Sequence, residues 1–170
     1  MKKYLVVAGG GAALSLGLAA PAASAAPVNC EDHPAAEVRT QEILAELPTE
    51  VANFREAARE GRQARKALNR YFAKSVRCAK VTFKLAVADD RETLKAVLTD
   101  SEATEEDKAT AKEAYKTATA PERAARKATV VDTRSTVQDA KKEVRSWFRS
   151  TVKELKANGQ GPKPAKANRA

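Results

Sequence analysis

Apolar residues recur at steps of three and four positions through residues 49–98. No proline or turn cluster interrupts this segment. Such spacing is typical of a helix with one face against a core, so the segment is predicted to form one long helix. Gly61 falls on that face, and its missing side chain would let another helix approach closely. The predicted stripe consists of Phe54, Ala58, Gly61, Leu68, Phe72, Val76, Ala79, Phe83, Leu94 and Val97.

Two further helices are predicted, one on each side of this long one. Residues 36–47 have an apolar side and should form a first short helix. Pro48 stands where the next helix can begin, because a first turn does not need its missing amide hydrogen. The last helix should reach Ala157 and end at Asn158 and Gly159.

Turn and capping signals divide the region between these helices. Asp100 or Ser101 can cap a helix whose first turn is acidic, as the helix dipole prefers. Thr119 and Glu122 have the spacing of a capping box. A new helix, or a kink in the same one, is therefore expected at Pro121.

These elements predict an all-α protein. We expect an elongated antiparallel bundle or hairpin of three or four helices, one of them very long, in a single domain over residues 26–157. Folding near residue 100 would bring residues 137–155 alongside residues 51–68. Residues 158–170 are rich in Pro, Lys and Ala and are expected to be a disordered basic tail.

The first 25 residues are predicted to be a secretory signal peptide. A charged start at residues 2–3 precedes an uncharged run over residues 4–20, and the small residues at 23–25 supply a cleavage site. The alternative is a membrane anchor, but the run is short and is diluted by glycines. The mature protein is therefore expected to be secreted, either extracellular or associated with the cell envelope.

The chain has two cysteines, Cys30 and Cys78, and both follow the predicted leader. An even number in an oxidising compartment favours one intramolecular disulfide. Closing a loop of roughly 50 residues would stabilise the fold by about 4 kcal/mol. Two unlinked thiols, or a bridge between chains, are the alternatives.

Positive charge is the most distinctive feature of the composition. The formal net charge is +9, from 31 basic and 22 acidic residues. At about 100° per residue, one group of cations falls in a narrow sector of the long helix, away from the apolar stripe. We call this group the basic row and predict that it binds anions. Its members are Arg55, Arg59, Arg62, Lys66, Arg70, Arg77, Lys80 and Lys84.

An acidic first helix offers another interpretation of the basic row. Glu37, Glu42 and Glu46 could pair with the cations at its start, leaving a face that is merely solubilising. The last helix adds further cations, from Arg123 to Lys156, and the acids cannot neutralise both sets.

No enzymatic, cofactor or metal motif is found. His33 is the one histidine, so a histidine-based triad or a multi-histidine metal site cannot be assembled within one chain. Paired carboxylates such as Asp89 and Asp90 are common on helix surfaces and do not indicate acid–base chemistry. We expect a non-enzymatic protein that needs no cofactor, and no small-molecule substrate is implied.

Two functions remain open. The first is binding of an anionic polymer or surface, such as a cell-wall glycopolymer, a polysaccharide or nucleic acid, through the basic row. The second is a structural role in which the chain associates with itself or with a protein partner. Apolar side chains near the end of the long helix support the second role, among them Phe83, Leu94, Val97 and Leu98.

Overall fold

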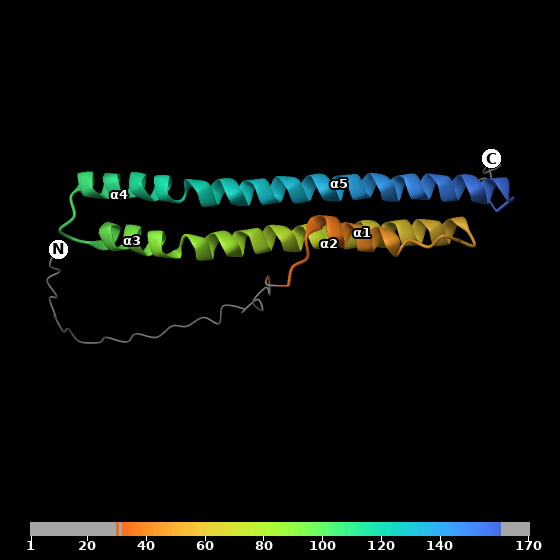
Figure 1. Ribbon diagram of the computed structural model, residues 1–170, viewed down its shortest axis with the longest axis horizontal. Coiled ribbons are helices and arrows are strands. Elements are labelled where there is room, and N and C mark those ends of the chain that lie inside the picture. The colour runs from red at the N-terminus through yellow and green to blue at the C-terminus, as the bar shows by residue number, and fades with distance from the viewer. Residues whose placement is uncertain (1–29, 31, 161–170) are drawn as a thin grey trace, which may run out of the picture.

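The computed structural model describes residue 30 and residues 32–160, and this part of the chain is all α-helical. It contains five helices: α1 (Ala36–Ala45), α2 (Phe54–Ala86), α3 (Ala88–Thr99), α4 (Glu105–Ala118) and α5 (Ala120–Ala157). Figure 1 shows one arm made of α2 and α3, an antiparallel arm made of α4 and α5, and α1 alongside α2. The predicted all-α, elongated fold is confirmed. The described residues hold more helices than expected, and two of the helices are very long.

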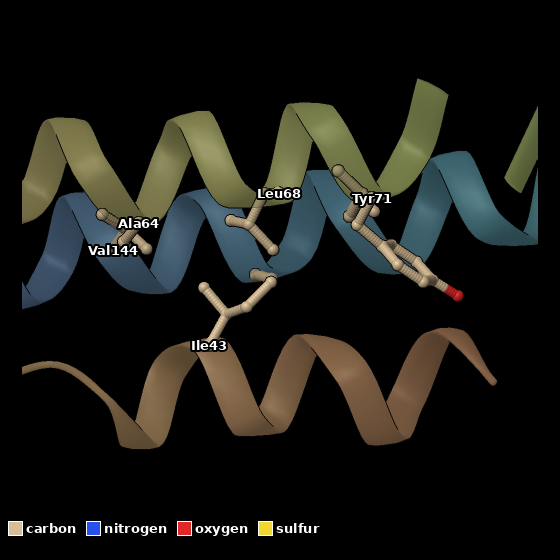
Figure 2. Close-up of a cluster of buried hydrophobic side chains, with 7 residues drawn as sticks. Ile43, Ala64, Leu68, Tyr71 and Val144 are labelled. Atoms are coloured by element: carbon tan, nitrogen blue, oxygen red, sulfur yellow. The ribbon is translucent and has the colours of Figure 1, made fainter. Parts of the chain in front are cut away.

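Small and branched side chains hold the two long helices together. Leu68 of α2 and Val144 of α5 are completely buried, and Ile43 of α1 is 1% exposed. Figure 2 shows Ile43 pointing from α1 toward the side chains of α2 and α5. The first helix therefore completes the core rather than lying loosely on it. The cluster comprises Ile43, Ala64, Leu68, Tyr71, Val137, Ala140 and Val144.

The predicted disulfide is confirmed. Cys30 and Cys78 are joined, with their Cα atoms 5.4 Å apart. This bond ties the segment before α1 to the second half of α2. At the other end of α1, the indole nitrogen of Trp147 donates a hydrogen bond to the Pro48 carbonyl over 3.1 Å. The first helix thus runs antiparallel to α2, as the sequence predicted.

The prediction that a helix begins at Pro48 is wrong. The long helix starts at Phe54, because Asn53 caps it: the Asn53 side-chain oxygen accepts from the Glu56 amide over 3.0 Å. The Glu56 carboxylate accepts in turn from the Ala52 amide over 2.9 Å. Side chains satisfy free amides at this point of the chain, which fixes the first turn there.

The single long helix predicted for residues 49–98 is also wrong, since it is interrupted at Val87. This residue has φ −106° and ψ 17°, outside the α-helical range, and separates α2 from α3. Position 87 carries neither proline nor glycine. The apolar spacing therefore predicted an unbroken helix through this position. Val87 is 3% exposed. The interruption is therefore part of the packed structure.

A second interruption lies at Thr119, between α4 and α5. Figure 1 places the two interruptions at the same level along the molecule. The predicted capping box of Thr119 and Glu122 is absent, because the Thr119 hydroxyl donates to the Tyr115 carbonyl over 2.7 Å. Pro121 lies in the first turn of a new helix, which settles the choice between a break and a kink.

The turn between α3 and α4 differs from the prediction as well. Asp100 or Ser101 was expected to cap the following helix, but Asp100 accepts a hydrogen bond from the Glu102 amide and shapes the turn. Thr104 is the cap, in a reciprocal capping box with Asp107. The acidic first turn is present as predicted.

The end of the last helix agrees with the prediction. Gly159 has φ 71°, and its amide donates to the Lys156 carbonyl, while the Gln160 amide donates to the Leu155 carbonyl. These two bonds form a Schellman motif, which favours glycine at this position. The predicted signal peptide and residues 161–170 of the predicted tail lie outside the described residues.

We predict that Gly61→Ala stabilises the protein. A Cβ atom at this buried position would lie 3.5 Å from Trp147 and 3.9 Å from Phe148, which are ordinary contact distances. Alanine also favours the helix by about 1 kcal/mol relative to glycine. The free energy of unfolding, measured by urea denaturation, should rise by about 0.5–1 kcal/mol.

Gly61→Val is the matched control, because its extra methyl groups need room beside the Trp147 ring. It should lose the gain that alanine gives. A decrease in stability with alanine would contradict this account of the contact.

Candidate functional site

The basic row lies on the outer face of α2. Every one of its members is exposed, whereas the buried residues of the same helix lie about half a turn away around the helix axis. The row therefore faces away from α5 and from the core. From Arg55 to Lys84 it extends over about 45 Å of helix.

The acids of α1 do not neutralise the row. Glu42 lies 2.7 Å from Arg39 and Glu46 lies 3.8 Å from the same guanidinium, so both carboxylates pair within their own segment. Within the described residues, the row has one ion pair, between Arg59 and the neighbouring Glu60. The pairing of Glu37, Glu42 and Glu46 with Arg55, Arg59 and Arg62, which the sequence left open, is not found.

Successive cations of the row are spaced to suit a linear polyanion. Most neighbours are three or four positions apart, which is a rise of about 5–6 Å along the axis. Each charge is in water, where a single ion contact contributes little. Several contacts made at once add up, and each releases a counterion from the polymer.

The last helix adds arginines that rest on aromatic rings. The Arg126 guanidinium lies 5.6 Å from the centre of the Phe83 ring, and that of Arg134 lies 5.9 Å from Phe72. Arg123 makes a similar contact with Tyr115 of α4, at 5.7 Å. Sequence reasoning identified these cations but not their stacking, because the rings belong to other helices and no local signal links them.

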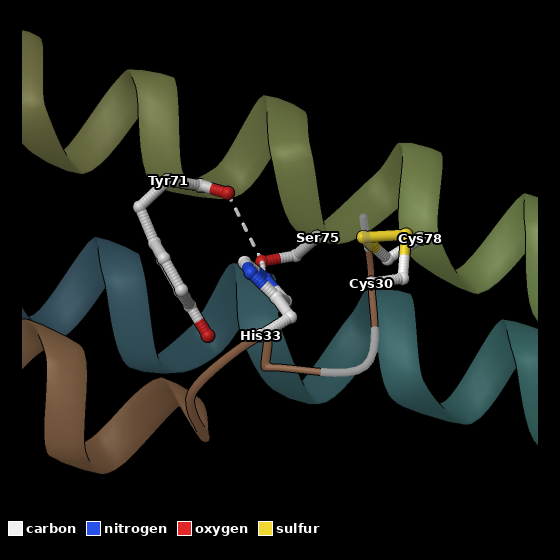
Figure 3. The surroundings of a disulfide bond; sticks show 5 residues. All are labelled: Cys30, His33, Tyr71, Ser75 and Cys78. Carbon is white, nitrogen blue, oxygen red and sulfur yellow. Dashed lines mark hydrogen bonds between the residues drawn. A yellow bond between two sulfur atoms is a disulfide. The ribbon is translucent and has the colours of Figure 1, made fainter. Parts of the chain in front are cut away.

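A second polar cluster surrounds the disulfide (Figure 3). The Ser75 hydroxyl donates to the Tyr71 carbonyl over 3.0 Å, so it can only accept from His33 Nε2, which lies 2.7 Å away. With the Ser75 hydroxyl donating to Tyr71, the tautomer of His33 that fits this contact carries its proton on Nε2. The imidazole also stacks on the Tyr71 ring at 5.0 Å, and the Tyr71 hydroxyl donates to the Pro34 carbonyl.

This arrangement anchors the segment before α1. His33 Nδ1 is buried and has no hydrogen-bond partner among the described residues. The Ser75 hydroxyl proton is held by a backbone carbonyl. Burial lowers the pKa of His33 from its ordinary value of 6.5, and the nearby positive charge of Lys74 lowers it further.

The described residues contain neither a cluster of metal ligands nor a helix suited to span a membrane. No three His, Cys, Asp or Glu side chains gather there in a way that could hold a metal ion. None of the helices α1 to α5 combines the length and the apolar character needed to cross a membrane.

Comparison of this chain with protein-family models, with curated proteins and with solved structures finds no match.

We predict that protonation of His33 weakens the fold. Because the pKa is lowered in the folded state, the unfolded chain takes up the proton first as the pH falls through about 6.5. The stability that neutral His33 provides is present above that pH and is lost below it. Urea denaturation at pH values of about 7.5 and 5.5 should show a lower free energy of unfolding at the acidic value.

His33→Gln is the matched variant, since an amide can still donate to Ser75 but does not titrate in this range. Its free energy of unfolding should fall less between the two pH values than that of the natural protein. Equal decreases in both proteins would show that other groups cause the dependence.

Proposed function

We propose that this protein is exported and binds a linear anionic polymer outside the cell through the basic row on α2. Export rests on the predicted signal peptide, and the disulfide is compatible with an oxidising compartment. The observation that carries the binding proposal is the exposure of every row cation opposite the core, with one ion pair among them. Cell-wall glycopolymers, acidic polysaccharides and extracellular nucleic acids share the required chemistry.

The row should not read a sequence of bases. Tyr71 is buried and Phe72 is half-buried beneath Arg134, so neither ring is free to stack on a base. Affinity would come from counterion release and would depend on the charge density of the polymer. We therefore propose non-enzymatic, sequence-independent binding.

Neutralising the row should flatten the salt dependence of binding. The test variant combines Arg62→Gln, Lys66→Gln, Arg70→Gln and Arg77→Gln. For duplex DNA, the slope of log affinity against log salt should fall in magnitude by up to about 3.6, because each of the four lost phosphate contacts removes about 0.9. Titrations on duplex DNA, heparin and wall polymer, starting at about 50 mM salt, measure this slope.

The matched control removes the same charge from the other end of the molecule. It combines Arg91→Gln, Lys95→Gln, Lys112→Gln and Lys116→Gln on α3 and α4, all of them exposed positions. Its slope should stay close to that of the natural protein, and circular dichroism should show the same helicity in both variants. Failure of the natural protein to bind any of the three polymers at the lowest salt would disprove the proposal.

Self-association is a second candidate, favoured by the packing of α3 and α4. Neither helix has a buried residue. Nearby, Leu85 is 73% exposed and Leu98 is 39% exposed. Phe83, Leu94 and Val97 are half-buried in the same region. A second copy of the chain could cover these side chains.

Sedimentation equilibrium tests this candidate. The natural protein should form a dimer at high micromolar concentration, and Leu85→Ser combined with Leu98→Ser should weaken that dimer at least tenfold. Val38→Ser, at another exposed apolar position, is the control and should leave the dimer unchanged. A strictly monomeric natural protein would exclude self-association.

A further inference from the structure

One flank of α5, next to the face that packs on α2, carries a hollow in which cations surround apolar side chains. Its volume is about 390 Å³, and it lies in the first half of the helix, apart from the basic row. We call it the α5 hollow. Val131 is 53% exposed there, and Val130 beside it is half-buried. The hollow is lined by Arg123, Arg126, Lys127, Val130, Val131 and Arg134.

Three arginines of this hollow lie over aromatic rings of neighbouring helices. Arg126 rests on Phe83 of α2, Arg134 on Phe72 of α2, and Arg123 on Tyr115 of α4. A guanidinium that stacks through its face keeps its N–H groups at the edge of the plane. These N–H groups remain able to donate to the oxygens of an anion. The side chains also lose less freedom on binding than unsupported arginines would.

The charge of the hollow is not balanced by neighbouring acids. None of its four cations has an ion pair among the described residues. At about 100° per residue, Asp132 projects from roughly the opposite side of α5, and Glu122 lies about a quarter turn from the centre of the hollow. An anion would therefore meet positive potential without a competing carboxylate.

We propose that the α5 hollow binds an organic phosphate in which the phosphate is joined to an apolar group. The stacked guanidiniums suit the phosphate oxygens, because Arg pairs with them through two parallel hydrogen bonds. Val130 and Val131 offer the adjacent apolar contact. This ligand class differs from the polymer proposed for the basic row, and the hollow would keep its selectivity whether or not the row binds a polymer.

Octyl phosphate, used below the concentration at which it forms micelles, is the probe, and inorganic phosphate is the comparison. Isothermal titration calorimetry on the natural protein should give octyl phosphate about tenfold higher affinity, equivalent to burying about two methylene groups. Arg126→Gln combined with Arg134→Gln should lower the affinity for octyl phosphate at least fivefold. Val131→Ser should reduce the preference over inorganic phosphate and leave the inorganic ion unaffected.

Arg62→Gln combined with Arg70→Gln is the matched control, since it removes the same charge from the basic row. It should leave octyl phosphate binding unchanged, which separates this proposal from polymer binding by α2. Lys127→Gln keeps the test valid if the double arginine variant misfolds. Lys127 has no ring contact among the described residues, so its substitution should leave the packing of α5 against α2 intact. It should still weaken octyl phosphate binding. Equal affinity for the two phosphates, or equal loss in the control, would overturn the proposal.

Vesicles distinguish two sources of the ligand. The natural protein is mixed with vesicles of phosphatidylglycerol and phosphatidylcholine. If it binds them and the double variant of Arg126 and Arg134 does not, the proposal is supported and the ligand is a lipid headgroup. Octyl phosphate binding without vesicle capture would support it with a free organic phosphate as the ligand. If the double arginine variant still binds the vesicles and the control variant of the basic row does not, the α5 hollow is not the binding site.

Discussion

The pairing of α2 with α5 is the interaction on which the rest of the structure depends. Leu68 and Val144 are completely buried in this pair, and most other buried positions of the two helices lie on the same sides. The opposite sides are left to water, and the sequence fills them with Lys and Arg. A helix as short as α1 is not stable alone. It is ordered because Ile43 enters the core and because Cys30 fixes the segment before it.

Local signals explain which parts of the fold the sequence could predict. The apolar spacing identified the long helix, Gly159 marked the end of α5, and the even cysteine count indicated the disulfide. The interruption at Val87 has no local signal, since no proline or glycine stands there. The Thr119 motif misled for a different reason: its hydroxyl could reach a carbonyl of the preceding turn as well as an amide of the next.

The candidate site shows the same limit. Exposure of the basic row followed from its position opposite the apolar stripe, which one helix determines alone. The ion pair of Glu42 with Arg39 depends on the conformations of both side chains, which the sequence does not specify. The contact of Arg126 with Phe83 depends in addition on how a second helix packs against α5. The molecule therefore presents two kinds of cationic surface. Side chains of the row are held by little besides their own helix, whereas those of the α5 hollow are supported by rings.

The position of the disulfide has a mechanical consequence. Tension applied to the chain before Cys30 would pass directly to Cys78 and so bypass α1, which would bear no load. If the chain beyond Gln160 were held, the force would run lengthwise between α2 and α5. Such shear loads the whole interface at once, whereas peeling would separate one turn after another. Attached at these two points, the molecule would act as a stiff tether whose strength comes from the full length of the paired helices.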